Sequence, residues 1–460
     1  MEETLSDIKP ATQERDQWQS QLGFLLSSIG SVVGLGTLWK LPYIMGQNGG
    51  GAFIILFMAC TLFVATPLFA AELVLGRQGR RGSIGIFTRL SRPNSGWSAV
   101  GRLNAIGALL VLSWYCVVAG WGLHYILIAL TDALQGKSVQ QVSDLFDLFR
   151  ASGELNVLFQ VLFLGLTGLM VLPGISQGIE RYSRVMAVGL FAVLLGLVAY
   201  SCTLSGFGQA VRYALTPDFA ALTPHGALKA LGLSLFSLSL GFGMTLTYGS
   251  YLRPTHDIPK TALTIGIANV VVTVLIALMV FPFVFTFGFA PQGGEGLVFK
   301  TLPYVFEQLS GSLLLSVLFF VLLLFAALTS SVAMLEAVVA NLMDTWGWSR
   351  PRSVLLGCLA GFIVGLPTAV VDLFPLWEAI YGKSFFATLD LLTDWMLVIA
   401  ALFTSLFVGW VVDQSVCKEG FVQGSRLAGL HRPWLFFVRF VVPCAVGIIL
   451  LQQAGLLAFQ

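Results

Sequence analysis

Two short stretches of this 460-residue chain interrupt long apolar runs with glycine: GSVVGLG at residues 30–36 and SLSLGFG at residues 237–243. Each glycine inside a helix costs about 1 kcal/mol relative to alanine, so clustered glycines weaken a helix locally. Backbone amides and carbonyls freed inside an apolar span are tolerated only where they line a cavity or meet a ligand. The two stretches therefore predict two broken helices. Close helix packing through small residues is the alternative interpretation.

The composition of the chain places these stretches in a membrane. Hydrophobic residues make up 57% of the chain and charged residues 10%, whereas a soluble protein carries roughly 25% charge. Apolar runs of about 20 residues, the length that crosses a bilayer, recur along the sequence. We expect an all-α polytopic membrane protein with about eleven spans, near residues 21–46, 51–77, 103–132, 156–173, 184–205, 228–252, 261–288, 311–343, 353–372, 386–413 and 434–457.

The two glycine-rich stretches fall in the first and the sixth expected span, five spans apart. Paired Gly-interrupted segments in corresponding positions point to the central site of transporters built from inverted repeats. The ends of broken helices offer amides to a carboxylate and carbonyls to a cation, which fits a zwitterion travelling with sodium. We expect a 5+5 inverted repeat, divided into an N-terminal tail (1–20), two five-helix repeats (21–205 and 228–413) and an eleventh helix (434–457).

Lys and Arg residues are distributed unequally between the two sides of these spans. With the N-terminus inside, eighteen of them lie on the inner side and six on the outer side. Because inner loops carry the excess of positive charge, we expect a multi-pass protein of the cell inner (plasma) membrane with a cytoplasmic N-terminus. The net charge of +2 gives no reason to expect nucleic acid. The lipid bilayer is the expected surrounding.

Five separate stretches carry a family resemblance: residues 18–42, NGGGAF at 48–53, GISQGIER at 174–181, FSLSLGFGMTLTYGSY at 236–251 and AALTSS at 326–331. Together, and in this order, they resemble the neurotransmitter:sodium symporter family, in the bacterial amino-acid transporter branch that includes the bacterial leucine transporter. The resemblance covers about residues 13–440. It implies sodium-coupled symport of a neutral, hydrophobic L-amino acid by alternating access. It implies no enzyme activity, no metal other than co-transported Na⁺ and no organic cofactor.

The resemblance implies two sodium sites. The second site would consist of the carbonyls of Gly30, Val33 and Ala326 and the hydroxyls of Thr329 and Ser330. An all-oxygen set suits a hard cation, although such hydroxyls often bond to carbonyls of their own helix instead.

The first sodium site would consist of Val32, Thr37, Ser237 and Asn269, together with the carboxylate of the substrate. Thr37 stands where the family usually has an asparagine. Because threonine offers one oxygen on a shorter stem, we expect a weakened or altered first site.

The resemblance also implies a substrate pocket. The carboxylate of the substrate would meet the amides near Leu35 and the hydroxyl of Tyr115, and the amino group would meet carbonyls near Ser31 and Phe236. Monoamine transporters carry an aspartate at the position of Gly34, so Gly34 favours an amino acid over an amine. A charged substrate side chain would stay unpaired here at high cost. The full predicted set is Ser31, Val32, Leu35, Gly36, Val111, Tyr115, Phe236, Ser237, Ser239, Phe242, Ser330 and Met334.

Charged residues near the breaks predict two gates. Lys40 would pair with Asp390 in the outer gate, with Asp394 as the other possible partner, because charges inside a membrane usually pair. The inner gate would consist of Arg15 and Asp344, packed around Trp18 and near Tyr251. Anchoring of these residues at the membrane interface is the alternative interpretation.

Two acids lie within expected spans, Glu72 in the second and Glu336 in the eighth. Glu72 matches a family acid that accepts a hydrogen bond from the broken backbone. Glu336 has no assigned role.

Four other functions compete with sodium symport. A channel would line a continuous pore with carbonyls or charge rings, and a membrane enzyme would show a cluster of catalytic residues. The sequence shows neither. A proton-coupled amino-acid transporter and a non-transporting amino-acid sensor on the same fold remain alternatives.

Overall fold

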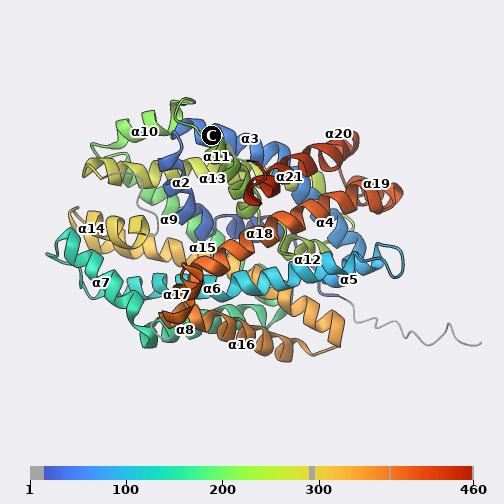
Figure 1. Ribbon diagram of the computed structural model, residues 1–460, viewed down its shortest axis with the longest axis horizontal. Helices are drawn as coiled ribbons and strands as arrows, with labels where there is room; N and C mark the ends of the chain where they lie inside the picture. Colours follow the sequence, from blue (N-terminus) through green and yellow to red (C-terminus); the bar gives the residue numbers. More distant parts are fainter. Residues whose placement is uncertain (1–14, 290–295, 372–374, 458–460) are drawn as a thin grey trace, which may run out of the picture.

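The computed structural model describes residues 15–289, 296–371 and 375–457, and every regular element within these ranges is a helix (Figure 1). The predicted all-α class is therefore confirmed. Residues 1–14, most of the expected N-terminal tail, lie outside the described ranges. The division into two inverted repeats stays a prediction.

The helices of the first half run from α1 to α10. They are α1 (Gln21–Val32), α2 (Leu41–Gln47), α3 (Gly51–Cys60), α4 (Thr66–Gly79), α5 (Ser83–Arg89), α6 (Ser98–Leu130), α7 (Val139–Ala151), α8 (Gly153–Val171), α9 (Glu180–Ser201) and α10 (Phe207–Leu215).

The helices of the second half run from α11 to α21. They are α11 (Pro224–Ser237), α12 (Met244–Ser250), α13 (Ile258–Thr286), α14 (Leu302–Glu307), α15 (Ser312–Trp346), α16 (Arg350–Ala369), α17 (Pro375–Tyr381), α18 (Phe385–Leu406), α19 (Gln414–Val422), α20 (His431–Phe436) and α21 (Val442–Gln453).

Within the described ranges, nine helices are long and apolar enough to cross a membrane, or ten if the bent pair 21–47 counts as one span. The expected span at 228–252 is not among them, because it consists of α11 and α12, of 14 and 7 residues, with a break between them. Short helices also occupy the connections between the expected spans, namely α5, α7, α10, α14, α17 and α19.

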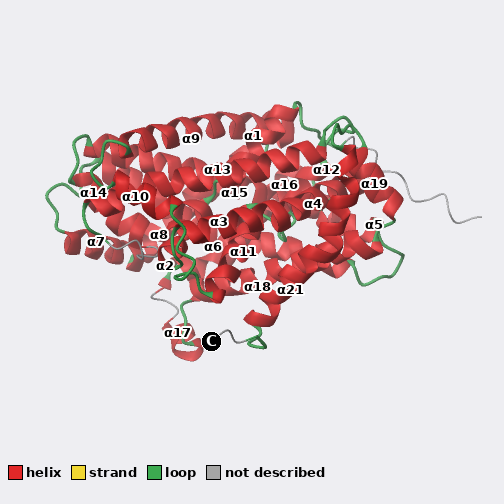
Figure 2. Cartoon of the chain, turned by 90° about the horizontal axis from the view of Figure 1, so that it is seen from above, coloured by secondary structure: helices red, strands yellow, loops and turns green. Residues whose placement is uncertain are grey.

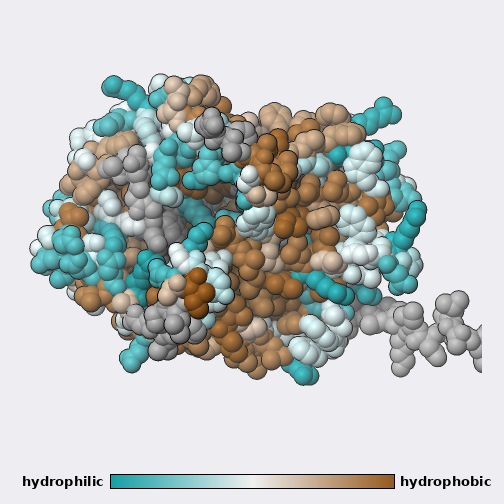
Figure 3. Space-filling model, viewed as in Figure 1, coloured by the Kyte–Doolittle hydropathy of each residue, from teal (hydrophilic) through white to brown (hydrophobic). Residues whose placement is uncertain are grey.

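The long helices run roughly along the longest axis of the molecule (Figures 1 and 2). Helices α7 and α14 lie at one end, called the α7 end below, and α5 and α19 lie at the other, called the α5 end. Apolar side chains cover much of the middle of the face in Figure 3, and hydrophilic ones gather toward both ends. This distribution is the one expected of a bundle whose middle lies in hydrocarbon.

Helices α6 and α15 form the centre of the bundle. Residues 111–122 of α6 and 326–341 of α15 are buried on all sides. A helix that is buried all round packs against neighbours through its whole circumference. These two unbroken helices therefore provide fixed walls on which the broken helices rest.

Both predicted breaks are present. Helix α1 ends at Val32, and the backbone of Val33 has left helical geometry at φ −82° and ψ 41°. A π-helical turn over Gly36–Lys40 then leads into α2, at an angle of 46° to α1.

The second break lies between α11 and α12. Ser239, Gly241 and Gly243 there have φ of 57°, 73° and 72°. Positive φ is costly for residues with a Cβ and disrupts an α-helix. The glycine-rich stretch therefore stops α11 and restarts the chain as α12.

Glycine also sets the distance between α4 and α12. A Cβ at Gly76 would lie 2.8 Å from the backbone atoms C of Gly249 and N of Ser250. Backbone atoms cannot move aside as a flexible side chain does. The short helix α12 is thus held tightly against α4.

We predict that Gly76→Ala lowers the melting temperature of the detergent-purified protein, because overpacking at a tight contact costs about 1–3 kcal/mol. Gly165→Ala in α8 is the matched control, since nothing lies within 4 Å of a Cβ there. Thermal unfolding followed by tryptophan fluorescence gives both values. Equal melting temperatures for the two variants would contradict the proposed contact.

Candidate functional site

A closed cavity lies between the two breaks. All twelve residues of the predicted substrate pocket line it, and its volume is about 20 Å³. A single water needs roughly 10–15 Å³ of such volume. The walls must therefore move before anything as large as an amino acid enters.

Three further residues line this cavity. Gly34 and Thr37 had been assigned other roles, and Met244 had been assigned none. Met244 is the first residue of α12 and directly follows the glycine-rich stretch. Its position next to Gly243 is the one feature of the sequence that could have placed Met244 in the predicted substrate pocket.

Tyr115 of α6 meets the first break. Its hydroxyl accepts a hydrogen bond from the amide of Leu35 at 3.2 Å. A Cβ at Gly34 would lie 2.6 Å from Oγ of Ser330 and 3.4 Å from the Tyr115 hydroxyl. The wall thus has no room for an aspartate at position 34.

Two hydroxyls of α15 reach across to the end of α1. Oγ1 of Thr329 lies 2.8 Å from the carbonyl of Gly30 and 3.0 Å from that of Ala326. Oγ of Ser330 lies 3.1 Å from the same Ala326 carbonyl. The structure brings these four residues of the predicted second sodium site together.

Val33, the fifth residue of that site, directly follows the last residue of α1. The last carbonyls of a helix have no partner within it. Carbonyls of this last turn accept from side-chain hydroxyls, Gly30 from Thr329 and Val32 from Thr37, and a ligand can replace these partners. The combination of neutral oxygens fits a hard cation.

The residues of the predicted first sodium site form two hydrogen-bonded pairs. Oγ1 of Thr37 donates to the carbonyl of Val32 at 3.0 Å, and Nδ2 of Asn269 donates to Oγ of Ser237 at 2.8 Å. Oδ1 of Asn269 is buried and has no hydrogen-bond partner in the described structure. A buried acceptor without a partner costs about 1–3 kcal/mol. A cation beside Asn269 would satisfy it.

Glu72 of α4 holds the second break. Its Oε1 accepts a hydrogen bond from the amide of Gly241 at 3.0 Å, and the side chain is fully buried. This contact is the one that the family resemblance implied for Glu72. An acid on an unbroken helix thus satisfies an amide that the break exposes.

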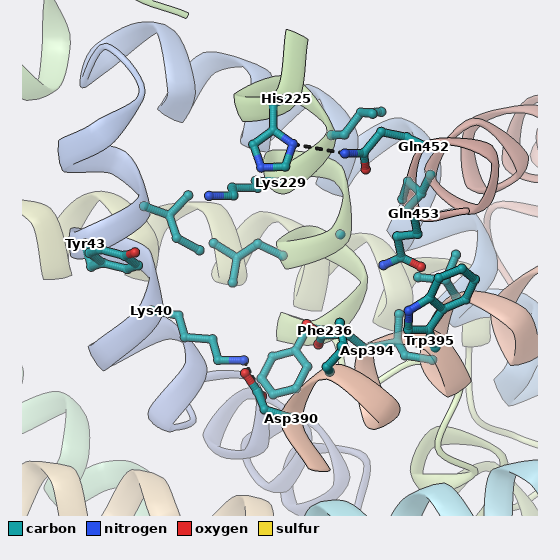
Figure 4. Close-up of a pocket in the computed structure, with 18 of the residues that line it drawn as sticks. Lys40, Tyr43, His225, Lys229, Phe236, Asp390, Asp394, Trp395, Gln452 and Gln453 are labelled. Carbon is teal, nitrogen blue, oxygen red and sulfur yellow. Dashed lines mark hydrogen bonds and ion pairs between the residues drawn. The ribbon is translucent and has the colours of Figure 1, made fainter. Parts of the chain in front are cut away.

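Lys40 and Asp390 close the cavity toward the α7 end. Their Nζ and Oδ1 atoms are 2.7 Å apart, and Nζ lies 5.1 Å from the ring centre of Phe236. Figure 4 shows the pair and the Phe236 ring at one border of a larger cavity of about 670 Å³. Asp394 lines this larger cavity as well. The ion pair and the ring therefore separate the large cavity from the small one.

Arg15 and Asp344 form the corresponding ion pair toward the α5 end, at 2.8 Å. The Arg15 guanidinium lies 4.7 Å from the ring centre of Tyr251. Trp18 is fully buried, and its indole donates to the carbonyl of Tyr248 at 3.1 Å. The predicted inner-gate residues thus lie together.

The Arg15 side chain remains charged in this setting. Burial by itself would lower the pKa of the guanidinium, but Tyr251 and the Asp344 carboxylate raise it above its ordinary value.

Glu336, which had no assigned role, joins this gate. Its carboxylate accepts a hydrogen bond from the Tyr251 hydroxyl at 2.6 Å and forms an ion pair with Arg350. Glu336 is fully buried. A buried carboxylate needs such partners, so Glu336 ties the end of α12 to α15 and α16.

Two more acids, absent from the sequence-based prediction, hold the segment before α1. Glu180 of α9 accepts from the amide of Gln19 at 2.6 Å and from the hydroxyl of Ser20 at 2.8 Å. Asp16 accepts from the amide of Ile175 at 2.6 Å. These contacts hold the residues before α1 in place, and with them Arg15 of the inner gate.

The fold and this site together define a class of protein. Helices of membrane-spanning length surround a closed cavity between two broken helices, and an ion pair closes each end of it. A channel needs a continuous pore, whereas a cavity closed at both ends suits alternating access. This arrangement is that of a secondary transporter.

Comparison with known proteins specifies the family. The model of the sodium:neurotransmitter symporter family matches residues 15–143 and 137–457. The chain belongs to this family, which confirms the resemblance seen in the sequence. It is a multi-span, sodium-dependent membrane transporter and not an enzyme, and sodium is its co-transported ion.

Similar proteins support this assignment along the whole chain. The sodium-dependent transporter YhdH of Bacillus subtilis (strain 168) is 36% identical over 457 residues, covering 99% of this chain and 100% of the relative. A sodium-dependent transporter of Haemophilus influenzae is 32% identical, covering 96% and 98%. The crystal structure of MhsT in complex with L-phenylalanine matches with a TM-score of 0.87 and 32% identity, covering 95% of this chain and 100% of that one.

We predict that Asp390→Asn opens the α7-end gate more than Asp394→Asn does, because Lys40 contacts Asp390 directly. The readout is the rate at which a membrane-impermeant thiol reagent labels Val111→Cys in the small cavity, with the exposed Cys202 and Cys444 replaced by serine. We expect an increase on the order of threefold to tenfold for Asp390→Asn, because the ion pair is partly exposed and such a pair contributes about 1 kcal/mol. A larger increase for Asp394→Asn would reassign the partner of Lys40.

Proposed function

We propose that this transporter carries a neutral, apolar L-amino acid into the cell together with sodium, by alternating access. One observation carries the proposal: no Asp, Glu, Lys, Arg or His is among the residues that line the small cavity in the described structure. A charged substrate side chain would remain unpaired there at high cost. The main-chain charges of an amino acid, in contrast, have partners available at the two breaks.

The carboxylate of the substrate would bind at the first break. The Leu35 amide and the Tyr115 hydroxyl already lie 3.2 Å apart beside the cavity, and both can donate to a carboxylate. Val32 and Thr37 of the predicted first sodium site line the cavity beside them. Since Gly34 leaves no room for an acid, the substrate must supply its own carboxylate, as an amino acid does.

The amino group would bind at the second break. Ser239 lines the cavity with a positive φ, and the chain there has left the helical hydrogen-bonding pattern. Carbonyls at the C-terminal end of α11 favour a cation because of the helix dipole. A zwitterion thus fits between the two breaks in one orientation.

Alternating access follows from the two gates. Separation of Lys40 from Asp390, with rotation of Phe236, would join the small cavity to the larger one at the α7 end. Separation of Arg15 from Asp344 would open the opposite end. Sodium at the second site would hold the end of α1 against α15, because its predicted oxygens come from both helices. Loss of that sodium would free α1 to move.

The excess of Lys and Arg on one side supports the orientation. We place the α5 end, with the N-terminus, in the cytoplasm and the α7 end outside, in the inner (plasma) membrane of the cell. The large cavity then faces the exterior, where the substrate arrives.

We predict sodium-dependent uptake of neutral amino acids such as L-phenylalanine into proteoliposomes. The double variant Thr329→Val with Ser330→Ala should lose this dependence, because it removes both hydroxyl oxygens of the second site. Ser331→Ala is the matched control: its hydroxyl contacts Thr167 and faces away from the cavity. Uptake driven equally well without sodium would refute the proposal, and binding without accumulation would indicate a sensor.

For the first site we predict a sodium Hill coefficient of about one, since the Thr37 hydroxyl is on a shorter stem than the asparagine amide oxygen that the family usually has there, which weakens coordination of the cation. Thr37→Asn should raise the coefficient by restoring an amide oxygen. Uptake measured over a range of sodium concentrations tests both. A wild-type coefficient clearly above one would show two strong sodium sites instead.

A further inference from the structure

The ring of Phe242 lies between the small cavity and Gly107 of α6. Phe242 lines the cavity and is 1% exposed. On its far side lies Gly107 of α6, where a Cβ would stand 2.9 Å from Cδ1 and 3.4 Å from Cε1 of the ring. Contacts of 2.9 Å are shorter than carbon atoms allow. The ring therefore occupies space that any residue other than glycine at position 107 would take.

The backbone on both sides of Phe242 is held in place. The Gly241 amide is bound to Glu72, and a Cβ on Gly241 would lie 2.6 Å from the carbonyl of Leu397. A Cβ on Gly243 would lie 3.3 Å from Asn104, which is one turn before Gly107 on α6. Both neighbours are thus packed against fixed elements.

Helix α6 also resists displacement, because from Gly107 it continues directly into residues 111–122, which are buried on all sides. A close-packed interior yields at its softest point. Here the Phe242 ring yields most easily, because it can rotate about its side-chain bonds. A side chain at position 107 would push the Phe242 ring toward the cavity.

A second ring limits the space that remains. Phe236 lies perpendicular to Phe242, with ring centres 6.4 Å apart, and it is covered by the Lys40 ammonium. A Phe242 ring that turned into the cavity would therefore narrow the part between the two rings. Contacts with the main-chain groups of a substrate at the first break would remain.

We propose that Gly107 determines the size of the substrate side chain: by lacking a Cβ it lets the Phe242 ring recede against α6, so that the pocket admits large apolar and aromatic side chains. This inference rests on the proposed amino-acid transport. Gly107 does not line the cavity and acts through Phe242, so it is a positioning residue.

The test compares Gly107→Ala with wild type in sodium-dependent binding of L-phenylalanine and L-alanine to the purified full-length protein. We expect the Kd for L-phenylalanine to rise by about 10- to 100-fold, the range for a methylene-sized change in an apolar pocket. The Kd for L-alanine should change less than about threefold, because its methyl group does not reach the rings. Gly196→Ala in α9 is the matched control, since nothing lies within 4 Å of a Cβ there, and it should leave both values unchanged.

A double variant distinguishes this role from a general loss of folding. Gly107→Ala combined with Phe242→Leu should recover most of the L-phenylalanine affinity, because leucine is smaller than the ring that was displaced. The role of Gly107 is overturned if Gly107→Ala raises the Kd of both ligands equally, or if adding Phe242→Leu does not restore the affinity for L-phenylalanine. Neither result contradicts amino-acid transport. If the wild-type protein binds neither L-phenylalanine nor L-alanine in a sodium-dependent manner, both proposals are overturned.

Discussion

The structure depends on one constraint: backbone groups freed by two breaks deep in an apolar bundle must find partners. Unbroken helices supply them. Glu72 of α4 accepts from the Gly241 amide, Tyr115 of α6 accepts from the Leu35 amide, and Thr329 of α15 donates to the Gly30 carbonyl. Because these partners are side chains and not backbone, a ligand can replace some of them. The same breaks that weaken two helices thus create the site.

The fixed and the breakable contacts lie in different parts of the molecule. Around the breaks, α6 and α15 are buried on all sides and hold their positions by close packing. At the two ends, single ion pairs close the cavity, and each joins segments far apart in the sequence: Lys40 with Asp390 and Arg15 with Asp344. Lysine cannot form the two-pronged contact of arginine, so the pair at the α7 end is held by one hydrogen bond and by the nearby rings. Access therefore changes by breaking a few polar contacts, without disrupting the core.

Selectivity for the substrate depends on the few residues that surround the small cavity. Membership of the sodium:neurotransmitter symporter family establishes sodium dependence and transport, but monoamine and amino-acid transporters of this family differ in their substrates. The difference must lie in the few residues around the cavity. In this chain they are Gly34, which excludes an acid, and the rings of Phe236 and Phe242, each of which rests against a glycine.

The sequence by itself determined the features that depend on local backbone chemistry and apolar length, namely the two glycine-rich breaks and the long spans. Through the family resemblance it also indicated twelve of the fifteen residues that line the cavity and the paired charges of both gates. The tertiary structure decided what depends on contacts between distant segments. Glu336 is a gate residue because Arg350 and Tyr251 contact it in the folded protein. The span expected at 228–252 consists of two short helices. The proposed role of Gly107 depends on the Phe242 ring that packs against it. The preference of glycine for positive φ is a local property, so it can be inferred from the sequence one residue at a time. The contact between an aromatic ring and a glycine of another helix forms only when the two helices pack, so it cannot.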